Sequence, residues 1–338
     1  MTAGLTVAVT GARGYLGRAL VEALARDERV GSVVAIDVHP PRPGADTPPK
    51  ARAVACDVRD PRLAEALEDT DVLVHLAWRV LGVGRDAWSV NVDGSHNAFE
   101  TALGAGARTI IHASSAAAYG CSPDNPVPIP EDRPLRPVPA FYYPQTKVAV
   151  EQILDRLEQA HPEARIVRMR PVTILGPGAP IGPRIFPTLW DFDPLMQFVS
   201  MADVVRAFIA ALPSGDGDAA PAGAFNLGAP GPVLSSAVAG LLGLRRVRLP
   251  YRFARAAARA GAALRLPGAL NPGWVDMGRY PIVVDTARAE RELGWRASGD
   301  CTAALTSFAG QRATSSTPST SPRPSTPSTP STPTEAAQ

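Results

Sequence analysis

Two residues four positions apart, Tyr143 and Lys147 in the segment YPQTK, have side chains suited to proton transfer. Residues at i and i+4 of a helix lie on one face, so the lysine ammonium would favour the phenolate and lower the tyrosine pKa. A phenol tuned in this way can exchange a proton near neutral pH. The pair is therefore typical of the proton-transferring half of a hydride-transfer site.

A glycine-rich turn near the N-terminus indicates where a dinucleotide would bind. Gly11, Gly14 and Gly17 follow a short apolar run and open a helical pattern. Small residues at a strand–helix turn let the backbone approach a pyrophosphate, whose charge is favoured at the helix N-terminus. Three spaced glycines are also compatible with a tight turn that binds nothing, so the context of the turn has to decide.

Acidic residues at later strand ends supply part of that context. Asp37 ends the second predicted strand, where a carboxylate can accept hydrogen bonds from an adenosine ribose. Its charge would repel a 2′-phosphate, which favours NAD over NADP, although Arg13 and Arg42 could offset the repulsion. Asp57 follows the third predicted strand and could contact the adenine amine, or it could cap a helix before Pro61.

The elements that must hold these residues follow from hydrophobic periodicity. Strands are expected at Leu5–Thr10, Ser32–Asp37, Ala53–Cys56, Val72–Ala77, Thr109–Ser114, Ile166–Arg170 and Ala224–Gly228, and helices at Tyr15–Arg26, Arg62–Glu68, Arg85–Leu103, Tyr143–Gln159 and Ala202–Leu212. Several strands are apolar at nearly every position, as in strands covered on both faces. Strand–helix alternation of this kind predicts an α/β fold with a doubly wound parallel sheet.

The chain is expected to divide into two folded parts and a tail. Residues 1–175 with 198–228 are assigned to the dinucleotide-binding domain, and 176–197 with 229–310 to a smaller, discontinuous, mostly helical substrate-binding region. Residues 311–338 repeat Ser, Thr and Pro and contain almost no apolar side chains. Such a segment cannot bury enough surface to offset its ordering entropy, so we predict disorder there.

Charge and cysteine content exclude several classes of protein. The 34 basic and 32 acidic residues of this 338-residue chain give a net charge of +2, which argues against a nucleic-acid partner. The N-terminus has no signal-peptide pattern, and no apolar run approaches the length of a membrane span. Three scattered cysteines form no metal-ligand spacing and no disulfide framework. We expect a cytoplasmic protein with no bound metal and no stable membrane association.

Taken in order, these motifs resemble the extended short-chain dehydrogenases/reductases, the NAD-dependent epimerase/dehydratase group. The resemblance covers about residues 5–300. Its pieces include TGARGYLG from Thr10, Asp57-Val58, His75-Leu76-Ala77, Asn91-Val92-Asp93-Gly94, SSAAAYG from Ser114, YPQTK from Tyr143, Arg170-Pro171, Ala202-Asp203-Val204, Phe225-Asn226-Leu227-Gly228 and Glu292-Leu293-Gly294-Trp295. Membership implies an NAD-dependent enzyme acting on a small molecule, commonly as a homodimer.

The resemblance also implies roles for individual residues. Tyr143 would be the general acid/base, Lys147 would hold the nicotinamide ribose, and Ser115 would bond to the reacting oxygen. Asn91 would help a proton relay or serve a structural purpose. The implied cofactor contacts are Gly11, Arg13, Gly14, Tyr15, Leu16, Gly17, Asp37, Asp57, Val58, Leu76, Ala77, Tyr143, Lys147 and Pro171. Judged from the residues alone, Tyr143 could be a packed aromatic, since Tyr142 is adjacent and one of the two must point elsewhere.

The resemblance predicts the fold clearly, but it leaves several reactions open. Sugar-nucleotide 4,6-dehydratases of the group carry an acidic pair where this chain has Ala116 and Ala117, which argues against elimination. The segment Ile181–Phe198 is apolar, with Arg184 as one candidate for a diphosphate. We therefore expect an alcohol/ketone oxidoreductase for a rather apolar substrate. A sugar-nucleotide epimerase and a non-catalytic cofactor-binding regulatory protein are the alternatives.

Two further groups of residues favour structural interpretations. His75, His96 and His112 lie in apolar contexts and are expected to be structural histidines. Arg252, Arg255 and Arg259 recur at helical spacing and could contact an anionic surface. A solvated face that covers the second region is the favoured interpretation.

Overall fold

The computed structural model describes residues 4–39, 47–80, 85–139, 141–179, 185–214, 221–264, 266 and 271–315. Its centre is a seven-stranded parallel sheet with the order β11-β6-β5-β4-β1-β2-β3. The strands are β1 (Leu5–Thr10), β2 (Val30–Asp37), β3 (Ala51–Ala55), β4 (Val72–His75), β5 (Thr109–Ala113), β6 (Arg165–Pro171) and β11 (Gly223–Leu227). The predicted doubly wound α/β fold is confirmed, and the strand order reverses between β1 and β4, where such sheets bind ligands.

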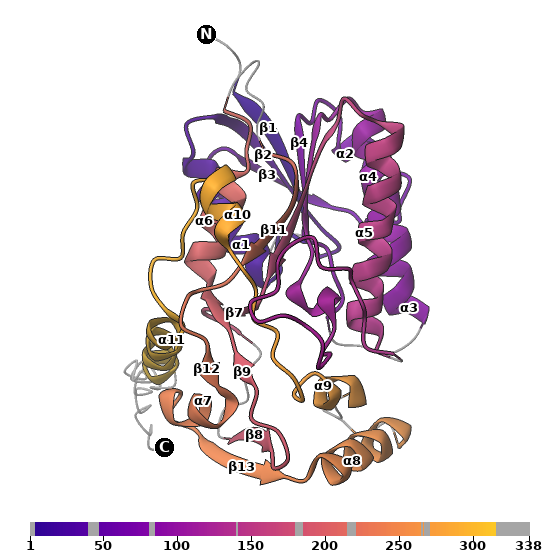
Figure 1. The fold of residues 1–338 in the computed structure, drawn as a ribbon. Coiled ribbons are helices and arrows are strands. Elements are labelled where there is room, and N and C mark those ends of the chain that lie inside the picture. The colour runs from indigo at the N-terminus through magenta and orange to yellow at the C-terminus, as the bar shows by residue number, and fades with distance from the viewer. Residues whose placement is uncertain are drawn as a thin grey trace, which may run out of the picture.

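Helices cover both faces of the sheet, as the apolar strands require (Figure 1). One face carries α1 (Tyr15–Arg26), α6 (Met201–Ala210) and α10 (Ala287–Glu292), and the other carries α2 (Leu63–Ala66), α4 (Gly94–Gly104) and α5 (Tyr142–Ala160). Successive residues of β1 enter different cores: Val7 and Val9 pack toward α1 and α6, whereas Ala8 packs toward α4 and α5. The sheet is therefore buried between two apolar layers.

The long helix predicted over Arg85–Leu103 is broken in the structure. It consists of α3 (Arg85–Trp88), a wider π-helical turn η1 (Ser89–Asp93), and α4, with the Gly94 amide donating to the Ser89 carbonyl. Single π-turns inside α-helices are frequent at functional sites. Here the turn places the Asn91 amide against the backbone of Arg79, with N–H···O distances of 2.8 and 3.1 Å.

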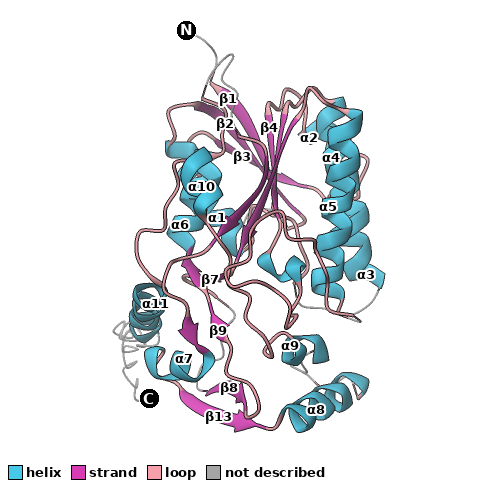
Figure 2. Ribbon diagram, viewed as in Figure 1, coloured by secondary structure: helices cyan, strands magenta, loops and turns pink. Residues whose placement is uncertain are grey.

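The second region contains more strand than predicted. Its pairs are β9 (Leu195–Met196) with β12 (Val233–Leu234) and β8 (Ile185–Leu189) with β13 (Arg245–Leu249), beside α7 (Ser235–Leu241), α8 (Tyr251–Ala263) and α9 (Pro272–Asp276) (Figure 2). A further pair, β7 (Thr173–Leu175) with β10 (Phe198–Ser200), lies in the ranges assigned to the dinucleotide-binding domain. Helix still exceeds strand in this region, as α7, α8 and α9 show, but RRVRL, expected within a helical stretch, pairs in parallel with a strand far away in the sequence. A short run has no local signal for such a partner.

The C-terminal end also differs from expectation. Helix α11 (Cys301–Ser315) continues past residue 311, so the first residues of the expected tail are helical, and residues 316–338 lie outside the described part. Trp295 is buried in the core on the α1 side of the sheet, where its indole N–H donates to the Asp203 carbonyl at 2.8 Å. The end of the range assigned to the second region thus packs on the sheet, and the division into domains stays a prediction.

Candidate active site

Ser115 and Tyr143 lie together where β5 and α5 meet. Ser115 follows the end of β5 and caps the 3-10 helix η2 (Ala116–Tyr119), its hydroxyl accepting from the Ala117 amide at 3.1 Å. Tyr143 is the second residue of α5, so Pro144 falls in the first turn, where it breaks no helical hydrogen bond. The Ser115 hydroxyl lies close enough to the Tyr143 phenol to oppose the rise that burial causes in the pKa of that phenol. One substrate oxygen could reach both hydroxyls.

The predicted effect of Lys147 on Tyr143 is not what the structure shows. Burial raises the pKa of Tyr143, and the Ser115 hydroxyl opposes that shift. The Lys147 ammonium instead donates to the Ala113 carbonyl at 2.5 Å and lies 3.3 Å from the centre of the Trp78 ring. Burial also holds the pKa of Lys147 well below its ordinary value. The expectation of a lowered tyrosine pKa was wrong because burial raises that pKa, while the Lys147 ammonium is directed to Ala113 and Trp78.

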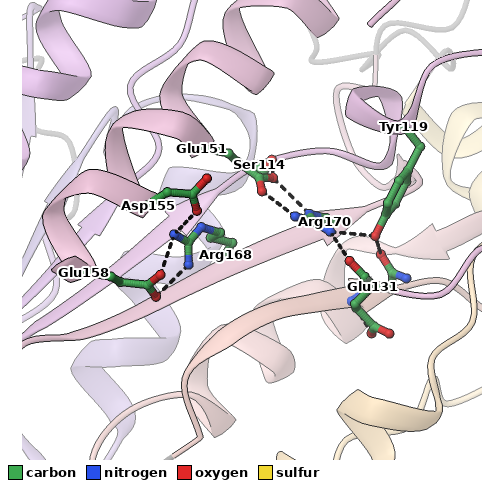
Figure 3. Close-up of polar contacts among 9 residues, drawn as sticks. Ser114, Tyr119, Glu131, Glu151, Asp155, Glu158, Arg168 and Arg170 are labelled. Atoms are coloured by element: carbon green, nitrogen blue, oxygen red, sulfur yellow. Dashed lines mark hydrogen bonds and ion pairs between the residues drawn. The ribbon is translucent and has the colours of Figure 1, made fainter. Parts of the chain in front are cut away.

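A buried ion pair fixes α5 against the sheet (Figure 3). The Arg170 guanidinium, from β6, donates through Nε to Glu151 of α5 at 2.9 Å, and both side chains are buried. Burial alone would lower the pKa of Arg170, but the bonds and charge of Glu151 raise it above its ordinary value. Ser114 donates to the same carboxylate, and Arg170 also donates to the Tyr119 hydroxyl at 2.8 Å. The segment from Ser114 to Tyr119, which contains Ser115, is thereby tied to α5.

A second ion pair extends the attachment along the same helix face. Arg168, two residues before Arg170 on β6, contacts Asp155 and Glu158 of α5 at 2.8 Å each (Figure 3). Sequence reasoning missed the role of Glu151. A signal existed, because Glu151 lies four residues after Lys147 and therefore continues the face that carries Lys147 and Tyr143.

Tyr142 and Asn91 point to other partners. Tyr142 donates its hydroxyl proton to the Val80 carbonyl, so the adjacent tyrosines do separate, and Tyr143 is the one beside Ser115. Both polar atoms of the buried Asn91 amide bond to the Arg79 backbone. Asn91 thus holds the segment after Trp78 in place. For Asn91 to take part in a proton relay, its hydrogen bonds to the Arg79 backbone would have to break.

Aromatic residues from a distant segment cover Tyr143. The Trp274 ring of α9 lies 5.6 Å from the Tyr143 ring and 4.9 Å from the Phe141 ring, measured between centres. Gly273 makes this approach possible, because a Cβ there would lie 2.2 Å from the Phe141 ring. Phe141, Tyr143 and Trp274, here called the aromatic wall, were not predicted as a group, since nothing local to YPQTK indicates α9.

The glycine turn lies at the reversal of strand order. Gly11 has φ +67°, and a Cβ on it would approach the Ala77 amide nitrogen to 2.7 Å. A Cβ on Gly17 would lie 2.2 Å from the Gly11 carbonyl oxygen, so the turn tolerates no side chain there. The Leu76 amide donates to the Thr10 carbonyl at 3.1 Å. Leu76 and Ala77 therefore lie beside the turn, as predicted for a cofactor cleft.

The geometry fits a dinucleotide. Helix α1 begins at Gly14, and no side chain of the described residues caps it, so its first amides can receive an anion. The Asp37 carboxylate accepts from the Arg13 and His39 amides at 3.0 and 3.1 Å, which fixes it next to the turn. A pyrophosphate at α1 and a ribose at Asp37 would use groups that the fold has already oriented.

The remaining predicted cofactor residues are dispersed around this turn. Tyr15 bonds to the Ile174 carbonyl at 3.4 Å, Leu16 packs on the core, and Pro171 ends β6 opposite Leu227. Val58 is buried. Asp57 forms an ion pair with Arg59 at 2.6 Å, so contact with an adenine amine would compete with that pair. Arg42 and Arg184 lie outside the described residues.

The three histidines have different environments. His75 is buried between the hydroxyls of Thr10 and Ser95, at 2.8 and 2.9 Å, and burial lowers its pKa to about 3. His112 is also buried, and within the described chain neither ring nitrogen has a partner. His96 is exposed on α4 and lies 3.4 Å from Glu100, one turn further along the helix.

Comparison with known proteins places the chain among nicotinamide-dependent enzymes. A family model described as "NAD dependent epimerase/dehydratase family" matches residues 7–228. An uncharacterised protein of Mycobacterium tuberculosis is 27% identical over 309 residues, which cover 86% of this chain and 79% of that protein. Sterol demethylase protein B of Methylococcus capsulatus is 34% identical over 217 residues, or 61% of this chain and 60% of that one.

The fold itself matches solved enzymes along nearly its whole length. The structure of MoeE5 in complex with UDP-glucose and NAD has a TM-score of 0.68 and 24% identity, and the match covers 92% of this chain and 99% of that chain. At this identity the likeness concerns the fold, and the printed ligands are those of MoeE5.

Proposed function

Because the chain belongs to the NAD-dependent epimerase/dehydratase family, we propose that it is an NAD-dependent oxidoreductase that interconverts a weakly polar secondary alcohol and its ketone. When bound, NAD accepts or supplies the hydride. Homologues of the chain include dehydrogenases, reductases and epimerases, so an enzymatic role is established while the particular reaction is the proposal.

In this proposal the protein's own residues manage the substrate oxygen and its proton. Tyr143 donates a proton to the oxygen as a ketone is reduced, because its raised pKa keeps the phenol protonated at neutral pH. Ser115 donates a second hydrogen bond and fixes the direction of approach. Alcohol oxidation uses the same pair in reverse, with the phenolate as the base. Lys147 is assigned to the cofactor ribose, and Asn91 to holding the segment after Trp78.

The aromatic wall is the observation that carries the choice of substrate. Trp274 lies against Tyr143, so a substrate oxygen at Tyr143 and Ser115 has an indole close to its carbon skeleton. Aromatic faces favour apolar skeletons and gain little from a sugar diphosphate in water. The likeness to sterol demethylase protein B, whose printed name refers to a sterol, supports the same class.

Elimination lacks the groups it needs. A dehydratase requires an acid and a base in addition to the redox pair, and the positions after Ser115 are Ala116 and Ala117. Both belong to η2, and Ala116 is buried. Simple transfer of a proton and a hydride therefore suits these residues better.

One observation favours a second candidate, a sugar-nucleotide epimerase. The Arg279 guanidinium lies among three aromatic rings in the second region, 5.3, 4.8 and 5.1 Å from the ring centres of Phe192, Tyr251 and Tyr280. Its Nε is buried without a hydrogen-bond partner in the described chain. A cation held in this way could receive an anionic substrate group.

A turnover screen separates the two candidates. Purified protein is incubated with NADH or NADPH and either polycyclic and long-chain ketones or UDP-sugars. The proposal expects stoichiometric NADH consumption with an apolar ketone. Tightly retained NAD, sugar epimers and no net cofactor consumption would replace it by the epimerase. The oligomeric state, for which a homodimer is proposed from the resemblance, is measured by light scattering on the same sample.

A further inference from the structure

Positive charge is concentrated in one part of this otherwise balanced chain. Residues 219–275 contain seven arginines and no aspartate or glutamate, whereas the whole chain has 34 basic and 32 acidic residues. This range includes β13 and α8, which follow each other along one end of the molecule, at the bottom of Figure 1. Because exposed charges of one sign add over a surface, this end has a positive potential.

The outer face of α8 is apolar and has no partner in the described structure. Phe253, Ala257, Ala260 and Leu264 recur at i, i+4, i+7 and i+11, so they lie on one stripe of the helix. Phe253 is 62% exposed and Leu264, which caps the helix, is 70% exposed. No residue of α8 is fully buried. Large apolar side chains gathered on an exposed face indicate an interaction site.

Arginines border this stripe. Arg252 and Arg259, seven residues apart, are exposed, and neither forms an ion pair within the described part of the chain. Arg255 is different: it turns inward and donates to Asp276 of α9 at 2.9 Å. The three arginines follow one another at helical spacing, but Arg255 is half-buried against α9. Only Arg252 and Arg259 accompany the apolar stripe outward.

The adjoining strands β8 and β13 also present exposed apolar side chains next to arginines. Trp190 is 62% exposed, and its amide bonds to the Leu249 carbonyl at the end of β13 at 2.8 Å. The Arg248 guanidinium lies 5.7 Å from the Trp190 ring centre. Ile185, which opens β8, is 51% exposed. An indole and arginines around an apolar stripe match the two components of a membrane interface, acyl chains and anionic headgroups.

We propose that the outer face of α8, together with Trp190 and Arg248, docks on a bilayer surface that contains anionic lipids. An amphipathic helix with arginines beside its apolar stripe lies flat in such an interface. The carboxylates nearest in the chain are already engaged, since Asp191 accepts from the Tyr251 amide and Asp193 from the Ser236 amide. None of the described helices has the length and apolar character to cross a bilayer, so the docking is peripheral and reversible.

A second copy of the chain fits this surface poorly. In a two-fold symmetric contact the same patch meets itself, so Arg252 and Arg259 of one copy would approach those of the other. Of the carboxylates that contact α8 in the described structure, Asp276 is paired with Arg255 and Asp191 accepts from the Tyr251 amide. An anionic bilayer offers the opposite charge across the whole patch and needs no matching shape.

The docking surface leads toward the candidate active site. Helix α8 is tied to α9 through Asp276, which accepts from the Tyr251 hydroxyl at 2.8 Å and from Arg255. Helix α9 carries Trp274, which covers Tyr143. Resting on the proposed function, this arrangement assigns the substrate to amphiphilic lipid alcohols or ketones that reside in the bilayer and enter past α9.

Vesicle flotation tests the docking directly, without substrate or turnover. The full chain is mixed with vesicles of phosphatidylcholine alone, or with 30% phosphatidylglycerol, at roughly 50 and 500 mM salt. Binding is expected to the anionic vesicles at low salt and to fall at high salt. The double variant Arg252→Ala, Arg259→Ala is expected to bind about 30-fold more weakly, since each arginine near such a surface contributes about 1 kcal/mol. Phe253→Ser is expected to weaken binding without a change in charge.

Matched variants keep the test decisive. Arg26→Ala with Arg62→Ala removes the same charge from exposed sites on α1 and before α2, and is expected to bind as the unmodified protein does. Tyr143→Phe is expected to bind the vesicles normally while it loses turnover. A failure of the docking proposal can therefore be told apart from a failure of the proposed function. Equal weakening by both arginine pairs, or no binding to anionic vesicles, would overturn the proposal. So would a dimer that Phe253→Ser dissociates in the absence of lipid.

Discussion

The sheet region and the second region approach the candidate active site with different chemistry. On the sheet side, buried charged groups hold the parts together, as Arg170 and Glu151 do between β6 and α5. On the other side, the Trp274 ring of the second region lies against Tyr143, beside the ring of Phe141, which directly precedes α5. Buried ion pairs require close geometry and resist displacement, whereas stacked rings can slide at small cost. Under the proposed function, the difference teaches that one half would hold the reacting groups and the other half would contact the substrate.

The first test asks whether the sheet side carries the residue that transfers the proton. Tyr143→Phe is expected to lower kcat by roughly 10³-fold or more, because a positioned acid/base contributes up to about 10⁴-fold. NAD affinity, measured by fluorescence titration, should change little. Tyr142→Phe is the matched control, since its hydroxyl bonds to the Val80 carbonyl and not to Ser115. Equal losses in the two variants would remove Tyr143 from its role, and unchanged biological function of Tyr143→Phe would favour a regulatory protein.

The second test addresses the rigidity of the sheet side. Glu151→Gln keeps the shape of the side chain but leaves the buried Arg170 guanidinium without its counter-ion. Such a loss is expected to lower the free energy of unfolding by about 3 kcal/mol. Glu158→Gln serves as the control, because Arg168 keeps Asp155. Urea denaturation measures both variants, and similar small losses would show that the buried pair does not anchor α5.

The third test perturbs the adaptable side alone. Gly273→Ala places a Cβ against the Phe141 ring, and the resulting overpacking of about 1–3 kcal/mol should push α9 away. We expect kcat/KM for an apolar ketone to fall roughly tenfold while NAD affinity is kept. Gly278→Ala, whose Cβ would make only an ordinary contact 3.4 Å from the Val275 carbonyl oxygen, should have no effect. If the two variants behaved alike, the aromatic wall would not form the substrate surface.

The last test concerns acid stability. Burial lowers the pKa of His75 to about 3 and that of His112 well below its ordinary value, so both stay neutral in the folded protein. Below the unfolded pKa, roughly 6.5, the unfolded chain binds protons that the native state excludes. The free energy of unfolding should therefore fall with pH, approaching about 1.4 kcal/mol per pH unit for each histidine.

Two variants check that assignment by urea denaturation between pH 7 and pH 5. His112→Phe should reduce the slope, since the ring lies among Phe99, Trp78 and His75 and, in the described chain, makes no hydrogen bond through its nitrogens. His96→Gln, at an exposed site, should leave the slope unchanged. An unaltered slope in His112→Phe would locate the acid sensitivity elsewhere.

Much of the sheet side was predictable because its signals are local. The strand Leu5–Thr10 and the helix Tyr15–Arg26 have the predicted bounds. The spacing of apolar residues within each segment is enough to identify a strand or an amphipathic helix. Ser115 could be placed at a strand end for the same reason. The π-turn around Asn91 was missed, because its cause is a bond to Arg79 that periodicity does not contain.

The second region was predicted less well for a related reason. The run Arg245–Leu249 was assigned to a helical stretch and forms a strand with Ile185–Leu189. Its conformation depends on a partner distant in sequence, and tertiary pairing overrides the weak preference of five residues. Arg255 was placed on the outer face of its helix, and only the contact with Asp276 shows that it faces inward.

By itself the sequence determined the α/β class and the glycine turn, and it supplied the residues proposed to transfer a proton, since these depend on spacing within a strand, a turn or a helix. Only the tertiary structure decided that Lys147 turns to Ala113 and Trp78, that Glu151 anchors α5, and that Trp274 covers Tyr143. Side-chain direction and burial depend on what other segments place nearby, and the balance between burial and the Ser115 hydroxyl that sets the pKa of Tyr143 arises only in the packed protein.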